Sequence, residues 1–152
     1  METNEHQTLL MTLMALNAGV LKKLNSRLSV HGLGWSDYQV LQALAAEPKQ
    51  TLRRIDLAER VGLTASGVTR LLNPMEKIGL VAKQASERDA RVSLVSLTEA
   101  GALMLSNAQV TVDELAQSLL CGLSVGRQHD LVDLLGDIAI APNPVLKQPI
   151  SG

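Results

Sequence analysis

Apolar residues recur at helical spacing through most of the chain, which predicts a mainly α-helical fold. The first such stretch covers about residues 5–30 and ends at the sequence His31-Gly32-Leu33-Gly34. Its apolar positions fall on more than one side of the predicted helix, so it needs partners on more than one side. Two arrangements satisfy this pattern: a helix buried in a monomeric core, or a helix shared between its own domain and a second subunit.

The next two predicted helices are short. Ser36 followed by Gln39 has the spacing of a capping box, which places a helix start there, and Pro48 ends that helix. Thr51 is the expected cap of a third helix, in which Ile55, Leu57, Ala58 and Val61 mostly face inward.

The stretch from Leu57 to Leu72 has the pattern of two helices joined by a tight turn. Ala58 is small enough for a second helix to cross close above it, and Gly62 stands where the first helix must stop. Thr64 is the expected cap of the second helix. This spacing is that of a helix-turn-helix, although any corner between two helices in a globular domain uses similar residues.

The second helix of this pair has two distinct stripes. The apolar stripe consists of Val68, Leu71, Leu72 and Met75. The polar stripe consists of Ser66, Thr69, Arg70 and Asn73. Hydroxyl, amide and guanidinium groups can pair with the donors and acceptors on base edges, so the polar stripe is a candidate for reading DNA.

Two strands follow this helix. Pro74 predicts a kink or an early break, since proline removes a helical hydrogen bond, with residues 75–78 continuing and Gly79 closing the helix. Residues 80–84 and 91–97 alternate as strands do, and residues 85–90 form a polar tip between them. A strand, tip and strand directly after a helix-turn-helix predict a winged helix.

The C-terminal third is again helical. Thr98 caps a long helix that runs to about Cys121, Gly122 stops it, and Ser124 caps a last helix. Three prolines beyond residue 141 preclude regular helix in a tail that covers residues 142–152.

Composition narrows the class of protein. The 152 residues contain no Phe, and Trp35 and Tyr38 are the sole aromatic residues, which favours a core of packed aliphatic helices. No apolar run is long enough to span a membrane, and residues 1–8 do not resemble a signal peptide. The lone Cys121 excludes an internal disulfide and fits a cytoplasmic location.

The net charge of −1 hides an uneven distribution. Residues 50–97 carry eight Lys or Arg against five Asp or Glu, a net charge of +3, whereas residues 98–152 carry −4. Positive charge around the helix-turn-helix would turn one face of the protein toward phosphate. Arg53 and Arg54 oppose the helix dipole in the first turn of the expected third helix, which makes more sense with a phosphate nearby, although at least one of them is expected to be a plain solvated arginine.

These motifs together resemble the MarR family of bacterial transcription regulators over about residues 5–140. The densest part of the resemblance runs from Leu57 to Gly101, and includes Met75-Glu76-Lys77-Ile78-Gly79-Leu80-Val81 and Asp89-Ala90-Arg91. The resemblance implies a mainly α dimer with a small β-wing. Residues 35–98 would form the winged helix-turn-helix lobe, and residues 1–34 and 99–141 the dimerisation helices.

The resemblance also implies a role for the wing. An arginine at its tip enters the minor groove of DNA, and this falls on Arg91, which Asp89 could fix by a charge-assisted pair. The family has an extra arginine where this chain has Ala90, and often has arginine where this chain has Lys83. The alternative is a polar hairpin tip whose charges lie in water. Two groups of residues are predicted to contact DNA. Those of the second helix of the helix-turn-helix are Thr64, Ser66, Thr69, Arg70 and Asn73. Those predicted to contact DNA through the wing or at the DNA backbone are Arg53, Lys83, Arg88, Asp89 and Arg91.

We therefore predict a dimeric repressor that binds a palindromic double-stranded operator and is released by a small, aromatic or anionic effector. The resemblance places the effector in a crevice near Met14, His31, Trp35 and Tyr38, although each of these residues can serve packing or capping alone. No cofactor or metal is expected, because the three histidines lack metal-ligand spacing. An enzyme is disfavoured, because the sequence has no recognisable Ser/His/Asp or paired-carboxylate signature. Two alternatives remain: a winged helix that binds only proteins, and a DNA-binding regulator switched by oxidation of Cys121. We expect Cys121 to be a buried structural cysteine, which is unsuited to such a switch.

Overall fold

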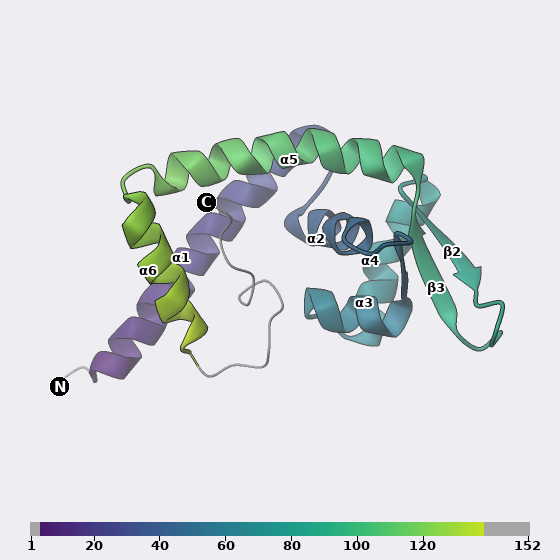
Figure 1. Ribbon diagram of the computed structural model, residues 1–152, viewed down its shortest axis with the longest axis horizontal. Coiled ribbons are helices and arrows are strands. Elements are labelled where there is room, and N and C mark those ends of the chain that lie inside the picture. The colour runs from purple at the N-terminus through teal and green to yellow at the C-terminus, as the bar shows by residue number, and fades with distance from the viewer. Residues whose placement is uncertain (1–3, 139–152) are drawn as a thin grey trace. The chain divides into compact units, whose positions relative to one another are not determined.

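A computed structural model describes residues 4–138 and shows a mainly helical protein with a small antiparallel sheet (Figure 1). The elements are α1 (Glu5–Leu28), η1 (Ser29–His31), α2 (Trp35–Ala45), β1 (Thr51–Arg53), α3 (Arg54–Val61), α4 (Ala65–Lys77), β2 (Val81–Ala85), β3 (Ser93–Leu97), α5 (Glu99–Leu120) and α6 (Val125–Gly136). The chain divides within α5 into two compact units, one up to Val112 and one from Asp113. The fold class predicted from the sequence is confirmed, and the predicted proline-rich tail of residues 142–152 lies outside the described residues.

The core of the first unit is aliphatic, as the scarcity of aromatic residues requires. Its fully buried side chains come from α1, α2, α3, α4 and the sheet: Leu28, Val40, Leu41, Leu44, Leu57, Val68, Leu72, Val81 and Val95. None of the buried residues in the described chain is polar or charged. The stability of this unit therefore depends on burial of branched aliphatic side chains, each of which contributes about 1.5–3 kcal/mol when fully buried.

The sheet has three strands in the order β1-β3-β2, where the sequence predicted two. Leu52 of β1 lies opposite Val95 of β3, and Lys83 of β2 lies opposite the same Val95 from the other side. The expectation that Thr51 caps a helix was wrong, because Thr51 lies in β1 and Arg53 stands at the N-cap of α3. A strand of three residues has too short a pattern to be recognised, and it forms because β3 supplies its hydrogen-bonding partner about forty residues later.

The start of α2 also differs from the sequence prediction. The helix begins at Trp35 with Gly34 at its N-cap, so Ser36 and Gln39 do not form a capping box. The carboxylate of Asp37 instead accepts the Gly34 amide at 2.7 Å, and the Asn25 carbonyl oxygen Oδ1 accepts the Trp35 amide at 2.9 Å. The side chain from α1 could not be assigned to this cap from local sequence.

Helix α4 continues through Pro74 to Lys77 with Ile78 at its C-cap, so the predicted continuation is present and an early break does not occur. Pro74 cannot donate a backbone hydrogen bond, but Leu72 and Met75 on either side of it are buried. Packing of the apolar stripe thus keeps the last turn helical. Gly79, with φ of 81°, then ends the helix and leads into β2.

Helix α5 begins close against the chain that follows α4. The Thr98 hydroxyl accepts the Gly101 amide at 3.0 Å, as expected for its cap, and lies 2.6 Å from the Gly79 carbonyl oxygen. A Cβ placed on Gly101 would lie 2.1 Å from the Leu80 carbonyl oxygen and 2.8 Å from Leu97 Cδ1. Only glycine allows this approach of helix and sheet.

The second unit contains the end of α5 and all of α6. Ser124 caps α6 by accepting the Arg127 amide at 3.3 Å, as predicted, and Gln128 Nε2 donates to the Leu123 carbonyl at 3.0 Å. Helix α6 has no buried residue, although several of its side chains are apolar. Within residues 4–138, no helix combines the length and the hydropathy that crossing a bilayer would need.

Replacing Gly101 with alanine is expected to destabilise the protein by about 1–3 kcal/mol, because the Leu80 carbonyl is backbone and cannot move aside cheaply. Urea unfolding at a fixed protein concentration measures this change. Gly126→Ala is the matched control, since its Cβ meets nothing within 4 Å and a helical alanine should stabilise by about 0.5–1 kcal/mol. Equal unfolding midpoints for the two variants would contradict the close approach at Gly101.

Candidate nucleic-acid interface

Helices α3 and α4 form the predicted helix-turn-helix. Gly62 adopts φ of 71°, a left-handed conformation that glycine takes without a Cβ clash, and the Leu63 amide donates back to the Ala58 carbonyl at 2.9 Å. Thr64 then caps α4 by accepting the Gly67 amide at 3.0 Å. Ala58 is buried beneath this turn. The turn therefore has the local geometry that its sequence predicts.

Burial of the apolar stripe decides which face of α4 is exposed. Val68, Leu72 and Met75 are at most 2% exposed, so the opposite side of the helix faces outward. Six polar residues of α4 and its cap are exposed: Glu76 and Lys77 in the last turn and, before Pro74, the four residues Thr64, Ser66, Arg70 and Asn73. We call these four residues the polar face of α4. They bring hydroxyl, guanidinium and amide groups to one surface.

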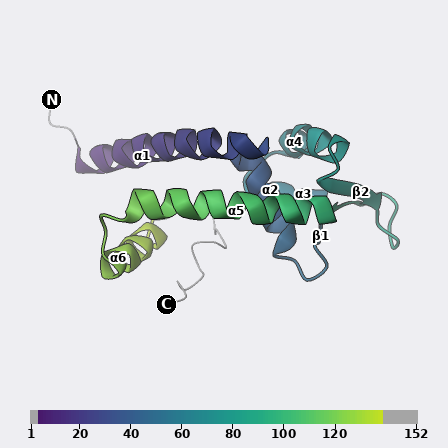
Figure 2. The same cartoon turned by 90° about the horizontal axis from the view of Figure 1, so that it is seen from above.

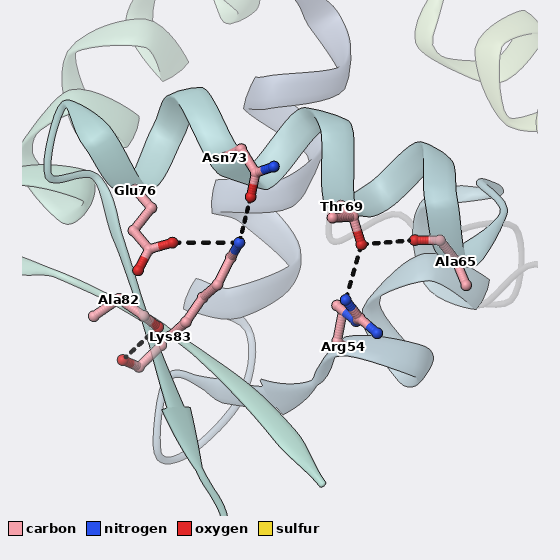
Figure 3. Close-up of polar contacts among 8 residues, drawn as sticks. Arg54, Ala65, Thr69, Asn73, Glu76, Ala82 and Lys83 are labelled. Carbon is pink, nitrogen blue, oxygen red and sulfur yellow. Dashed lines mark hydrogen bonds and ion pairs between the residues drawn. The ribbon is translucent and has the colours of Figure 1, made fainter. Parts of the chain in front are cut away.

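Thr69 is half-buried, and its hydroxyl is already bonded within the protein (Figure 3). The hydroxyl donates to the Ala65 carbonyl at 2.9 Å and accepts from Arg54 Nη1 at 2.9 Å. The structure therefore separates Thr69 from the exposed residues with which it was predicted. Arg54, which was considered with Arg53 for a nearby phosphate but not for a contact with α4, is brought from the start of α3 to the side of α4. No local pattern distinguishes Arg54 from Arg53, because the contact depends on how the two helices cross.

Lys83 connects the wing to α4. Its ammonium group Nζ donates to Asn73 Oδ1 at 2.6 Å and lies 3.3 Å from Glu76 Oε2 (Figure 3). Asn73 and Glu76 are one turn apart on α4, so one ammonium group reaches both. The Lys83 side chain is 24% exposed, and in this structure it is engaged with the helix rather than extended into solvent.

The wing hairpin formed by β2, β3 and residues 86–92 extends away from the helices of the first unit in both views (Figures 1 and 2). At its tip, Arg91 Nε donates to Asp89 Oδ1 at 3.1 Å and Nη2 donates to Oδ2 at 3.3 Å. The predicted pair between these residues is thus present, and the Arg91 side chain remains 91% exposed. Hydrogen bonds from the Arg91 side chain and then from its backbone lower the pKa of Asp89 below its ordinary value.

Two other predicted residues behave differently from Arg91. Arg53 forms a bidentate pair with Asp56, at 2.7 Å from Nε and 3.0 Å from Nη2, and this hydrogen bonding raises the pKa of Arg53. Its position at the N-cap of α3 is therefore balanced by a carboxylate within the same turn. Arg88 is exposed at the wing tip, where its backbone amide donates to Ser86 Oγ at 3.3 Å.

The predicted effector residues are only partly brought together. Trp35 stacks on the buried Tyr38 with ring centroids 5.4 Å apart, and His31 Nε2 lies 2.7 Å from the Thr111 hydroxyl of α5. Met14 lies on α1, fourteen residues before the helix ends at Leu28. At the rise of an α-helix this separation is about 21 Å, so Met14 of the same chain is not adjacent to the other three.

Cys121 is exposed, which corrects the expectation of a buried structural cysteine. It follows directly after the last residue of α5, where its thiol donates to the Ser118 carbonyl at 3.3 Å. The apolar sequence around it misled the prediction, because the apolar neighbours at the end of α5 are themselves exposed. Separately, residues 4–138 contain no group of three His, Cys, Asp or Glu arranged to hold a metal ion.

A sequence profile described as the MarR family matches residues 31–92, which include the helix-turn-helix and most of the wing. The HTH-type transcriptional regulator PapX of Escherichia coli is 30% identical over 117 residues, which cover 72% of this chain and 71% of PapX. The chain belongs to the MarR family of transcription regulators, a class of regulators rather than of enzymes.

Solved structures agree with this assignment. Sco3205, a MarR family regulator from Streptomyces coelicolor in complex with DNA, has a TM-score of 0.80 and 25% identity, over 89% of this chain and 86% of that one. CouR from Rhodococcus jostii RHA1, bound to p-coumaroyl-CoA, has a TM-score of 0.73 and 24% identity over 82% and 86% of the two chains. The winged-helix architecture is thus common to all three proteins.

The wing pair predicts a pH-dependent property of Asp89. Because its pKa is lowered in the folded protein, the contribution of the pair to stability is present above the unfolded pKa and is lost as the pH falls through the folded pKa. A carbon-detected NMR titration should place the Asp89 midpoint below that of an ordinary aspartate, and Arg91→Ala should return it toward that value. Arg88→Ala, at the same tip, should leave it unchanged. An Asp89 midpoint that does not respond to Arg91→Ala would contradict the pair.

Proposed function

We propose that this protein is a homodimeric, sequence-specific double-stranded-DNA-binding regulator that represses transcription and is released by a small molecule. The observation that carries the proposal is the polar face of α4, held outward by the buried Val68, Leu72 and Met75 and accompanied by the exposed Arg91 at the wing tip. A DNA complex of the similar Sco3205 supports the same reading.

In this proposal α4 enters the major groove and the wing enters the neighbouring minor groove. Ser66, Arg70 and Asn73 carry donors and acceptors that match base edges, and Arg70 is the sole cation among them. Arg91, fixed by Asp89 yet almost fully exposed, suits a narrow minor groove with its enhanced negative potential. Arg54, whose remaining N–H groups lie beside α4, is a further candidate for a phosphate contact.

The exposed apolar side chains of α1 and α6 support a dimer. In α1, Leu9, Leu10, Met11, Met14 and Leu16 are all more than half exposed. In and around α6, Val125, Leu131, Leu134 and Ile138 are exposed. These exposures contradict an N-terminal helix buried in a monomeric core, and contiguous apolar surface is typical of protein interfaces. We assign residues 1–34 and 99–141 to dimerisation and residues 35–98 to DNA binding, which implies a palindromic operator.

Repression follows if the dimer occupies base pairs that the transcription machinery needs. The proposed effector is a small aromatic or anionic compound, and CouR, which shares the fold, is bound to p-coumaroyl-CoA. Among the residues predicted to bind the effector, Trp35 and His31 are partly exposed, and the ring of the buried Tyr38 stacks on that of Trp35. Binding there would release DNA if the effector prefers a dimer geometry in which the two copies of α4 no longer match the operator.

A winged helix that binds only proteins is disfavoured by the chemistry of the polar face of α4. Its four side chains are neither apolar nor acidic, and the one acidic side chain of α4, Glu76, is paired with Lys83, whereas a protein-binding groove typically needs an apolar anchor.

Arg70→Ala is expected to weaken operator binding by about 1–3 kcal/mol and to relax specificity at one position in each half-site. Arg91→Ala is expected to weaken binding by a similar factor on every sequence, since the wing reads groove shape. Fluorescence anisotropy with the operator and with single-base variants measures both effects. Lys22→Ala, which removes a cation from α1, is the control. Wild-type affinity in both arginine variants would remove these residues from the interface.

Leu134→Glu is expected to convert the dimer into a folded monomer, because the side chain is 64% exposed in a single chain and its burial in a dimer would then require burying a charge. Sedimentation equilibrium measures the mass, and circular dichroism measures retained helix. Ile78→Glu, also 64% exposed but at the end of α4, should remain dimeric. A dimeric Leu134→Glu protein would exclude α6 from the interface.

A further inference from the structure

Lys83 differs from the other cations around α4, because its ammonium group is already bound to two residues of that helix. It lies 2.6 Å from Asn73 Oδ1 and 3.3 Å from Glu76 Oε2. Lys83 was predicted to contact DNA, and a wing lysine that bound a phosphate would extend toward the DNA. The structure instead connects Lys83 of β2 to two side chains of the recognition helix, one of them on its polar face.

The chemistry of this contact fixes the orientation of Asn73. An ammonium group only donates hydrogen bonds, so the atom of Asn73 that faces Lys83 must be the carbonyl oxygen Oδ1. The amide nitrogen is then turned away from Lys83 (Figure 3). Asn73 is exposed, so its two N–H groups are available to a ligand at the polar face of α4.

This orientation changes which base the asparagine can read. An unconstrained asparagine pairs with adenine in the major groove by accepting from N6 and donating to N7. An asparagine whose oxygen already accepts from an ammonium group presents its two N–H donors to the ligand, which favours a base edge that only accepts. Guanine presents two such acceptors, N7 and O6.

We propose that Lys83 is a positioning residue that sets the base preference of the recognition helix, by holding Asn73 with its amide N–H groups outward so that the pair selects guanine. This inference rests on the proposed DNA-binding function. Glu76 takes part by balancing the charge of Lys83, which keeps the ammonium group on the helix rather than on the phosphate backbone.

The test compares wild type with Lys83→Met, which has a similar length but neither charge nor donors. Each protein is bound to a library of operators randomised in the half-site, and its affinity for the best operator is titrated against salt. We expect Lys83→Met to lose at least about fivefold of the preference for guanine over adenine at one position per half-site. The slope of log affinity against log salt should stay that of wild type.

Three further variants make the result specific. Lys83→Arg should keep the guanine preference, because a guanidinium group also only donates. In an Asn73→Ala background, Lys83→Met should cause no further change in base preference. Lys22→Met is the matched control for loss of a lysine outside the interface. Lys83→Leu replaces Lys83→Met if the latter unfolds at a lower urea concentration than wild type, because leucine also has neither charge nor donor.

The outcomes separate this inference from the function on which it rests. A wild-type protein that binds no operator selectively overturns both. A Lys83→Met protein whose salt slope falls by about 0.9 shows a lost phosphate contact and overturns the positioning role alone. An unchanged guanine preference in Lys83→Met overturns it as well. A lost preference with an unchanged slope, dependent on Asn73, supports it.

Discussion

Burial of one side of α4 is the constraint on which the rest of the structure depends. Val68, Leu72 and Met75 pack into an aliphatic core that contains no buried polar residue among those described. Because the helix has a fixed period, burying this stripe leaves Ser66, Arg70 and Asn73 outside. The same packing carries the helix past Pro74, so its last turn and Glu76 remain in place beside the wing. Burial of the apolar stripe in the core thus determines which polar side chains of α4 are exposed.

The elements around α4 then determine what its polar side chains can do. Arg54 of α3 binds the Thr69 hydroxyl, and Lys83 of β2 binds the Asn73 oxygen. Each contact occupies one lone pair of an oxygen that the isolated helix would offer to DNA, and it orients the group that carries this oxygen. A recognition helix therefore cannot be read as a row of independent side chains, since its neighbours select which donors and acceptors remain available.

The two ends of the proposed mechanism have different physical characters. The wing carries an arginine that is exposed yet fixed by a carboxylate, which favours recognition of charge and groove shape. The helices assigned to dimerisation carry exposed apolar surface, whose burial would supply the energy of assembly. In the proposed dimer, apolar packing would set the spacing between the two copies of α4, whereas contact with DNA would be polar. An effector that alters the packing can release DNA without touching the polar face of α4.

The sequence by itself determined the helix order, the helix-turn-helix, the caps at Thr64, Thr98 and Ser124, and the wing pair of Asp89 and Arg91. Those features depend on residues a few positions apart, so their chemistry is visible in a short stretch. Tertiary structure alone decided the strand β1, the cap of α2 by Asn25, the exposure of Cys121, and the contacts of Arg54 and Lys83. These depend on residues separated by ten or more positions, or on which faces the packing leaves uncovered, and no local pattern encodes either.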